Sequence, residues 1–283
     1  MDEDTTDTGP AIRPVVRETY GPADLGGAPM FGGGFINFGY WRGIDLAEPL
    51  TEAQRISSQQ ELYRYVLAAA APGRADLLEV GSGLGTGCAL ALREYEGVAV
   101  TGMDIHPDQV RRARAAQPGL RFVRGAAEAM PFGDAEFDVV ISVEAAQHFA
   151  DLAAFAAETA RVLRPGGRVA LAGFFTVDDA PGRPDQLAAM LDTFANGLDV
   201  ARPVAALTAE FAAAGLTDAR AESIGAQVWP GWDSWLSRWW APDTWPRNFL
   251  RAYREGILDY YLVTAGRPVG GTAADRTGAI LPR

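Results

Sequence analysis

Segment 77–87 constrains the fold more than any other part of the chain. It reads Leu-Leu-Glu-Val-Gly-Ser-Gly-Leu-Gly-Thr-Gly, an apolar run followed by glycines at alternate positions. The apolar run is typical of a strand buried on both faces. Glycines without a Cβ let the backbone turn sharply and approach a ligand closely. A strand that ends in such a turn and opens a helix predicts a small-molecule site in an α/β fold.

Short apolar runs and helical patterns alternate along the rest of the chain. The runs predict buried strands at 77–80, 98–103, 120–123, 138–143 and 169–174. Helices are expected after Leu84, from Pro107 and from Asp151, and the last of these is expected to include Leu163 and to end at the turn residues 164–167. Further along, the pattern predicts helices at 185–197 and 204–214 and strands at 219–224 and 260–264. This alternation predicts a doubly wound α/β domain with a mostly parallel sheet.

The domain boundaries follow from composition. Residues 1–12 and 269–283 are expected to be disordered tails, and 13–72 to form an N-terminal lid with a helix at 51–70. Thr51 and Gln54 have the spacing of a capping box at the start of that helix. The α/β domain is expected at 73–268, with a tryptophan-rich insert at 227–257 before the last strand.

Charge and residue usage exclude several classes of protein. The net charge of −11 argues against nucleic acid, whose binding depends on basic residues. No apolar run reaches the roughly 20 residues of a membrane span, and the acidic N-terminus is unlike a signal peptide, so no membrane partner and a cytoplasmic location are expected. The single cysteine, Cys88, excludes an intramolecular disulfide and a multi-cysteine zinc site. The two histidines, His106 and His148, leave few ligands for a metal centre.

A carboxylate at the end of the second predicted strand supports a nucleoside-containing ligand. Asp104 lies 21 residues after Gly83 (104 − 83 = 21), at an offset suited to accepting hydrogen bonds from ribose hydroxyls. Nicotinamide dehydrogenases use G-x-G-x-x-G at the same place, but here Thr86 stands where their third glycine would be. The spacing is instead E-x-G-x-G-x-G, beginning at Glu79.

Four motifs together resemble the class I S-adenosylmethionine-dependent methyltransferases, over about residues 51–175. They are Glu79-Val80-Gly81-Ser82-Gly83-Leu84-Gly85, Asp104, Phe137-Asp138-Val139-Val140 and Leu163-Arg164-Pro165-Gly166-Gly167. The resemblance implies S-adenosyl-L-methionine as the cofactor and a seven-stranded sheet whose last strand, here 260–264, runs antiparallel between two others.

The resemblance also implies roles for individual residues. Glu79 would orient the amino group of the methionine moiety, Gly81 and Gly83 would admit that moiety, Asp104 would hold the ribose, and Ile105 would lie against adenine. The complete set of expected cofactor-binding residues is Tyr40, Glu79, Gly81, Ser82, Gly83, Asp104, Ile105, Ala126, Ala127 and Val143.

One position departs from the family pattern. After the third strand the family commonly has Gly-Asp-Ala-Glu, with the Asp accepting the adenine amino group, whereas this chain has Gly125-Ala126-Ala127-Glu128. Because Ala126 has no polar side chain, the adenine amine is expected to bond to a backbone carbonyl or to water.

His148 is the candidate catalytic residue. It follows the fourth predicted strand, at the edge of the sheet where the methyl donor is expected. An imidazole can take a proton from a hydroxyl at neutral pH. The alternatives are that His148 caps the next helix or packs against adenosine, and His106 is expected at the surface or at the adenine edge.

Two aromatic segments are expected to enclose the site. Segment 37–41 resembles the N-terminal segment of small-molecule methyltransferases, in which a tyrosine, here Tyr40, closes over the methionine end; the alternative is a hydrophobic anchor. Tyr20 is a further candidate substrate residue. In the insert, Trp232, Trp235 and Trp239 share one helical face and predict contacts with an apolar acceptor, or else a small satellite core or a dimer contact.

These observations predict a single-domain methyltransferase for a small, apolar or aromatic acceptor, in bacterial specialised metabolism such as antibiotic biosynthesis. Oxygen is the favoured acceptor atom. One alternative is methylation at carbon on a prenyl or indole-linked acceptor, with cyclisation as a variant, because aromatic rings stabilise cations. A second alternative is a cofactor-binding cyclase or regulator that does not methylate. The sequence does not identify the acceptor, and it leaves open whether the protein is a monomer or a homo-oligomer.

Overall fold

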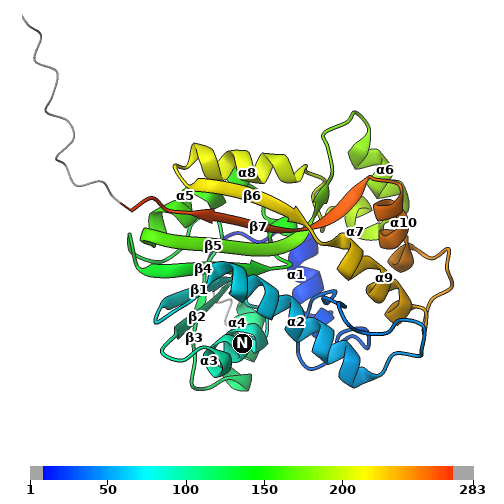
Figure 1. Cartoon of the computed structure of the whole chain (residues 1–283), viewed down its shortest axis with the longest axis horizontal. Coiled ribbons are helices and arrows are strands. Elements are labelled where there is room, and N and C mark those ends of the chain that lie inside the picture. The colour runs from blue at the N-terminus through cyan, green and yellow to red at the C-terminus, as the bar shows by residue number, and fades with distance from the viewer. Residues whose placement is uncertain (1–8, 270–283) are drawn as a thin grey trace, which may run out of the picture.

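The computed structural model describes residues 9–269 and contains one seven-stranded sheet. The strand order is β3-β2-β1-β4-β5-β7-β6, as Figure 1 shows. The strands are β1 (Asp76–Val80), β2 (Ala99–Asp104), β3 (Arg121–Arg124), β4 (Phe137–Val143), β5 (Leu163–Thr176), β6 (Thr217–Ser223) and β7 (Leu258–Gly266). The predicted doubly wound α/β fold is confirmed.

Strand β7 is antiparallel to its neighbours, whereas β1 to β5 run parallel. Residues Arg168–Thr176 of β5 pair antiparallel with β7, which pairs antiparallel with β6 on its other side. The predicted antiparallel strand at 260–264 therefore lies where the family resemblance placed it.

Helices cover both faces of the sheet. They are α1 (Pro14–Tyr20), α2 (Glu52–Ala70), α3 (Thr86–Glu94), α4 (Pro107–Ala116), α5 (Leu152–Val162), α6 (Arg183–Met190), α7 (Asp192–Ala195), α8 (Val204–Ala213), α9 (Gly225–Leu236) and α10 (Asn248–Arg254), with 3-10 turns η1 (Leu25–Gly27), η2 (Ala146–His148) and η3 (Trp245–Arg247). Successive residues of β1 point to opposite faces, so Leu77 packs in the core under α2 and α3, and Leu78 in the core under α5 and α8. Among the described residues, no helix is both long and apolar enough to cross a bilayer.

Local capping signals in the sequence act as expected. Thr51 accepts a hydrogen bond from the Gln54 amide while the Gln54 side chain accepts one from the Thr51 amide, which is the predicted capping box of α2. His106 caps α4 ahead of Pro107, and Asp151 caps α5.

Three sequence-based expectations are wrong in detail. Helix α5 ends at Val162, and Leu163 already belongs to β5, because it pairs with Phe137 before residues 164–167 bulge out of the ladder and pairing resumes at Arg168. The predicted helix at 185–197 is two short helices, α6 and α7, since the chain is extended at Leu191. Helix α9 ends at Leu236, so Trp239 does not share its face.

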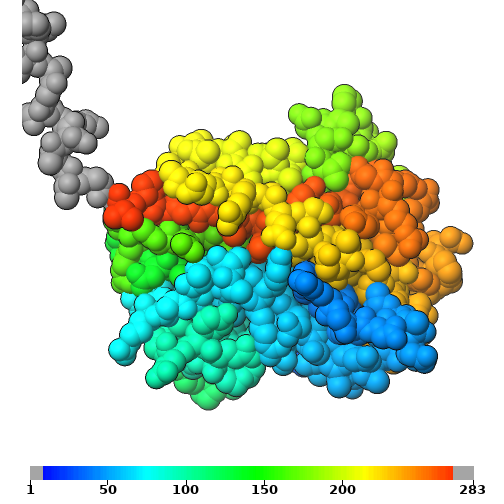
Figure 2. Space-filling model, viewed as in Figure 1, coloured from blue at the N-terminus to red at the C-terminus, as the bar shows by residue number. Residues whose placement is uncertain are grey.

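The N-terminal segment and the tryptophan-rich insert lie together beyond the carboxyl ends of the parallel strands. The backbone amide of Trp41 donates to the Gln227 carbonyl of α9 at 2.8 Å, and Figure 2 shows the blue N-terminal residues against the yellow and orange insert. Residues 9–12, expected to belong to a tail, are described, and Ile12 is buried against Val16 and Leu198. Residues 1–8 of this tail and residues 270–283 of the expected C-terminal tail lie outside the described residues.

Candidate active site

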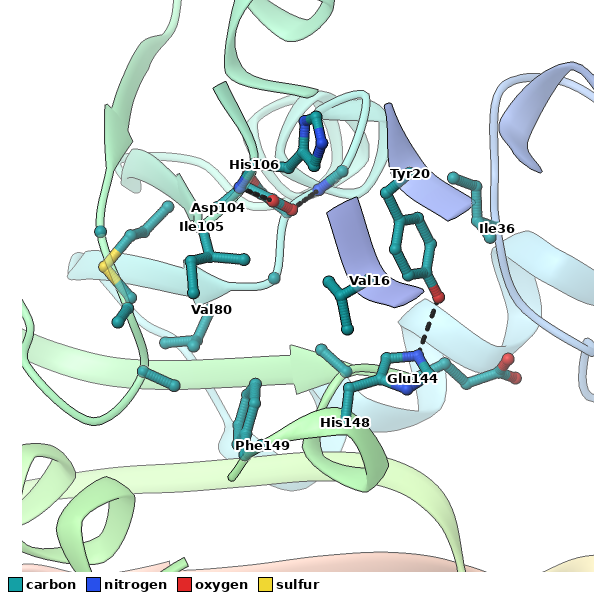
Figure 3. Close-up of a pocket in the computed structure, with 18 of the residues that line it drawn as sticks. Val16, Tyr20, Ile36, Val80, Asp104, Ile105, His106, Glu144, His148 and Phe149 are labelled. Carbon is teal, nitrogen blue, oxygen red and sulfur yellow. Dashed lines mark hydrogen bonds between the residues drawn. The ribbon is translucent and has the colours of Figure 1, made fainter. Parts of the chain in front are cut away.

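A cavity of about 420 Å³ lies at the carboxyl ends of β1, β2, β3 and β4 (Figure 3). Its floor is made of the segments that follow these strands, and its roof of residues 10–20 and 34–36 from the N-terminal segment. The volume lies within the range of roughly 300–1,000 Å³ typical of ligand pockets. The cavity therefore occupies the crevice in which α/β folds bind ligands.

The glycine-rich turn after β1 is held by Asp104. The Gly83 amide donates to Asp104 Oδ2 at 2.9 Å, and the His106 amide donates to Oδ1 at 2.8 Å. Gly81 and Gly83 both have positive φ. A Cβ on Gly81 would lie 2.3 Å from the Ala145 Cβ, whereas one on Gly83 would meet nothing closer than 3.9 Å. Gly81 thus permits packing against the segment after β4, and Gly83 keeps the turn open toward the cavity.

Most of the expected cofactor-binding residues line this cavity. They are Gly81, Ser82, Gly83, Asp104, Ile105, Ala126, Ala127 and Val143. Ala126 lies on the wall with no polar side chain, and its carbonyl accepts a hydrogen bond from Ala129. His106, expected at the surface or the adenine edge, is 3% exposed and lines the cavity. Helix α1 covers it, and its Nε2 lies 3.0 Å from the Arg17 carbonyl of that helix.

Glu79 does not line the cavity. Its carboxylate is fully buried, and accepts hydrogen bonds from the Tyr63 hydroxyl at 2.7 Å and from the Cys88 thiol at 2.9 Å. Burial raises the pKa of Glu79 to about 7, against the lowering effect of these two donors. Tyr63 lines the cavity instead and connects Glu79 to it.

Tyr40 also does not line this cavity. Its ring stacks on Tyr65 at a centroid distance of 4.7 Å, and its amide donates to the Ser58 carbonyl of α2. The preceding Gly39 has a φ of +85°, which turns the chain so that Phe38 and Tyr40 take different directions. The cavity wall near this segment is formed by Phe35 and Ile36.

His148 lies at the end of η2 with both ring nitrogens engaged. Its Nδ1 is 3.1 Å from the Leu198 carbonyl, which fixes the proton on Nδ1. Its Nε2 is 2.8 Å from the Tyr20 hydroxyl, which then donates to it, as the dashed line in Figure 3 marks. The Oδ1 atom of Asp199 is 3.0 Å from Nδ1, and Asp199 as a whole is 4% exposed. An imidazole held in this way can accept a proton at Nε2 and be stabilised as a cation by Asp199.

A second cavity of about 130 Å³ adjoins the first. The two share Tyr20, Ile36, Glu144 and His148. Its other lining residues come from the N-terminal segment, η2, β5, the 193–199 region and the insert. They are Leu25, Met30, Phe31, Phe38, Gln147, Phe174, Thr193, Leu198, Asp199, Trp232, Leu236, Trp240, Trp245, Pro246 and Phe249. His148 and Tyr20 therefore lie at the junction of a nucleoside-sized cavity and an apolar one.

The three tryptophans expected to contact the acceptor have different positions. Trp232 lines the second cavity. Trp235 does not; its indole donates to the Met30 carbonyl at 3.0 Å and anchors the N-terminal segment on α9. Trp239 follows the end of α9 and is 44% exposed. Trp240 and Trp245 line the cavity but were not predicted to do so, because they do not follow the helical period.

Glu144 was also missed. It lines both cavities, and its Oε1 accepts hydrogen bonds from the Phe38 amide at 2.6 Å and the Tyr260 hydroxyl at 2.7 Å. Its φ of +50° is strained for a residue with a side chain, a feature that concentrates at functional sites. Burial raises the pKa of Glu144 to about 8. The sequence feature that could have identified Glu144 is its position as an acid directly after the buried strand β4.

Helix α1 is fastened over the first cavity at both ends. At its start, the Arg13 guanidinium donates to the carbonyls of Gly197, Leu198 and His148. At its end, the carbonyl of Tyr20 accepts from Gln109 at 2.9 Å and from Arg112 at 3.1 Å. These bonds place Tyr20 over His148.

Comparison with known proteins finds similarity to methyltransferases. Residues 78–171 match a family described as a methyltransferase domain. A fatty-acid O-methyltransferase of Mycolicibacterium smegmatis is 35% identical over 154 residues, 53% of this chain and 54% of that protein. A phthiotriol/phenolphthiotriol dimycocerosates methyltransferase of Mycobacterium leprae is 35% identical over 164 residues, 54% of this chain and 61% of that protein. The chain thus spans little more than half the length of these curated relatives.

Solved structures share the fold. A geranyl diphosphate C-methyltransferase from Streptomyces coelicolor superposes with a TM-score of 0.70 at 17% identity, covering 82% of this chain and 93% of that one. The cyclase SpnF superposes with a TM-score of 0.63 at 20% identity, covering 83% of this chain and 89% of that one. At these identities the likeness concerns the fold alone.

Proposed function

We propose that the chain is a class I S-adenosylmethionine-dependent methyltransferase that methylates a hydroxyl oxygen of a small apolar acceptor, because residues 78–171 match a methyltransferase domain. The observation that carries this proposal is the junction of the two cavities at Tyr20 and His148. One cavity has the glycine turn and the carboxylate that suit a nucleoside, and the other is walled by aromatic rings.

The first cavity fits S-adenosylmethionine as the cofactor. When bound, this cofactor supplies a methyl group on a positively charged sulfur. The open turn at Gly83 suits its methionine moiety, Asp104 keeps lone pairs free for ribose hydroxyls, and Ile105 and Ala127 offer an apolar wall for adenine. The turn needs no phosphate-binding cation, which agrees with a ligand that carries no phosphate.

His148 acts as the general base in this proposal. With its Nδ1 proton held by the Leu198 carbonyl, its Nε2 lone pair faces the cavity junction, where the Tyr20 hydroxyl now occupies it. An acceptor hydroxyl that takes the place of the Tyr20 hydroxyl would give its proton to Nε2 as its oxygen is methylated. Asp199 beside Nδ1 would stabilise the resulting imidazolium.

The relatives support an apolar acceptor. One is named for fatty acids and another for dimycocerosates, both of which are lipids, and the second cavity of this chain has aromatic walls on which a hydrocarbon body can pack. We infer a place in specialised metabolism from the same likeness.

Methylation at carbon is the second candidate, and Glu144 favours it. Its carboxyl group lies at the cavity junction beside the rings of Phe38 and Phe174 and, with a pKa of about 8, can give up its proton when a cation forms on an alkene beside it. A geranyl diphosphate C-methyltransferase also shares the fold. Product analysis separates the candidates: a new methoxy signal supports oxygen, and a new carbon-bound methyl supports carbon.

Cofactor binding is tested by thermal unfolding. S-adenosylmethionine and S-adenosylhomocysteine at about 100 times their Kd are expected to raise Tm by roughly 5 °C, since a ligand that binds only the folded state stabilises it. NAD should give no shift. In Asp104→Ala the shift should be lost, because the side chain that holds both the Gly83 turn and the ribose is absent.

The control for this test is Asp134→Ala, since Asp134 lies outside the cavity with a side chain 80% exposed. It should keep the full shift. An NAD shift larger than that of S-adenosylhomocysteine, or an unchanged shift in Asp104→Ala, would contradict the assignment of the first cavity.

A further inference from the structure

Among the residues that the structure describes, the second cavity is lined by two acids and by no guanidinium group. Its described lining includes the carboxyl groups of Glu144 and Asp199 and the imidazole of His148, but no arginine. The chain contains no lysine. An anion bound there would lie beside two acidic groups and would lack a guanidinium partner, which is the usual ligand of carboxylates and phosphates.

The nearest arginines are already engaged elsewhere. Arg55 is fully buried behind Trp232, with its guanidinium carbon 5.0 Å from that ring, and donates to the carbonyls of Met30 and Asn37. Arg13, at the start of α1, donates to the carbonyls of Gly197, His148 and Leu198. Neither side chain lines the second cavity, so neither guanidinium can contact a ligand there, although the charge of Arg55 lowers the pKa of Glu144 against the raising effect of burial.

Several buried polar atoms of this lining have no hydrogen-bond partner. They are Gln147 Oε1, Asp199 Oδ1, Thr193 Oγ1 and Trp232 Nε1. Gln147, Asp199 and Trp232 are each at most 5% exposed. Asp199 Oδ1 lies near His148 Nδ1, but the Nδ1 proton is directed at the Leu198 carbonyl. A buried polar atom left unpaired costs about 1–3 kcal/mol.

The polar side chains of the lining indicate the polar groups of a ligand for this cavity. A side-chain carboxyl oxygen, as on Asp199 and Glu144, suits a ligand group that donates a hydrogen bond. Trp232 Nε1 only donates, so it suits an oxygen acceptor. A hydroxyl group provides both functions without a charge.

The rest of the cavity is apolar and flat-walled. Phe38 stacks on Trp232 at 4.5 Å and on Phe174 at 5.6 Å, and Phe31 stacks on Trp232 at 5.8 Å. Such walls favour a ring or a short hydrocarbon chain.

We propose that the second cavity binds an uncharged acceptor with hydroxyl groups on an apolar body and rejects carboxylates and diphosphates of the same shape. This inference rests on the proposed function, because it assigns the acceptor site of the same reaction. It defines the acceptor more narrowly than the names of the relatives do, since the carboxylate form of a fatty acid would not bind the second cavity.

The test compares two probes that differ in one group, 4-ethylbenzyl alcohol and 4-ethylbenzoate, titrated near pH 7 into the full chain saturated with S-adenosylhomocysteine. The alcohol is expected to bind at least about 100-fold more tightly, because a carboxylate would be desolvated without a partner. Asp199→Asn, which removes one negative charge without changing shape, should narrow this ratio at least about tenfold by strengthening benzoate binding.

A matched pair of tryptophan variants locates the probe. Trp232→Ala removes a wall of the cavity and should weaken alcohol binding at least about tenfold, whereas Trp239→Ala should leave it unchanged because Trp239 lies outside the cavity.

The outcomes separate the inference from the function on which it rests. Without stabilisation by S-adenosylhomocysteine, the proposed function itself fails. With that stabilisation, benzoate binding as tight as alcohol binding, or no binding of the alcohol, would overturn the inference about the acceptor.

Discussion

A His148→Ala variant is expected to lose kcat by about 10²- to 10⁴-fold with an alcohol or phenol that binds the second cavity, the range typical of general-base catalysis. The physical reason is the loss of the Nε2 lone pair at the cavity junction, where the acceptor hydroxyl must give up its proton. The measurement is the single-turnover release of S-adenosylhomocysteine. The Tm shift with S-adenosylhomocysteine should persist, since the glycine turn and Asp104 are untouched.

Two further readouts separate catalysis from structure. Added imidazole should restore part of the rate of His148→Ala, because the missing ring leaves space at the junction. Asp199→Asn should lower kcat by only about tenfold, or ~1.4 kcal/mol, since it removes the charge that stabilises the imidazolium while the Leu198 carbonyl still fixes the Nδ1 proton. A His148→Ala rate equal to that of the wild type would exclude the base and favour methylation at carbon, which needs no deprotonation before attack.

The sheet and the cofactor turn were predictable because their determinants are local. Strand β1 is an apolar run of residues adjacent in sequence, and the positive φ angles at Gly81 and Gly83 require glycine there. Asp104 follows β2, so the parallel pairing of β1 with β2 brings it to the turn. Spacing along the chain and topology were sufficient for this half of the site.

The second cavity was not predictable, since its residues come from segments with no shared pattern. Asp199 lies in the loop after α7, 51 positions after His148 (199 − 148 = 51), and only the folded chain brings them within 3.0 Å. Tyr40 was expected near the cofactor, but the turn at Gly39 directs its ring to Tyr65. Glu79 was expected to orient the cofactor, yet Tyr63, on the preceding helix α2, bonds to Glu79 through its hydroxyl and lines the cavity in its place.

The position of Glu79 has a measurable effect on stability. Its pKa is about 7 in the folded chain against an ordinary value of 4.5, so the folded chain keeps a proton that the unfolded chain releases. The stabilisation is complete below about pH 4.5 and is lost as the pH rises to about 7, a difference of about 3 kcal/mol. Relative to Glu79→Gln, which stays neutral, the wild type should therefore lose this free energy of unfolding between about pH 4.5 and 8.

Denaturant unfolding across this pH range measures the difference between the two curves. Burial raises the pKa of Glu144 in the same direction, so the double variant with Glu144→Gln should have a still flatter profile. Glu94 is the matched control with the opposite sign: hydrogen bonding from Arg64 lowers its pKa, so Glu94→Gln should remove stability that the wild type gains as the pH rises through the acid range. Parallel curves for Glu79→Gln and the wild type would mean that Glu79 ionises alike in the folded and unfolded chains, and that its buried contacts with Tyr63 and Cys88 offset the whole cost of burying the charge.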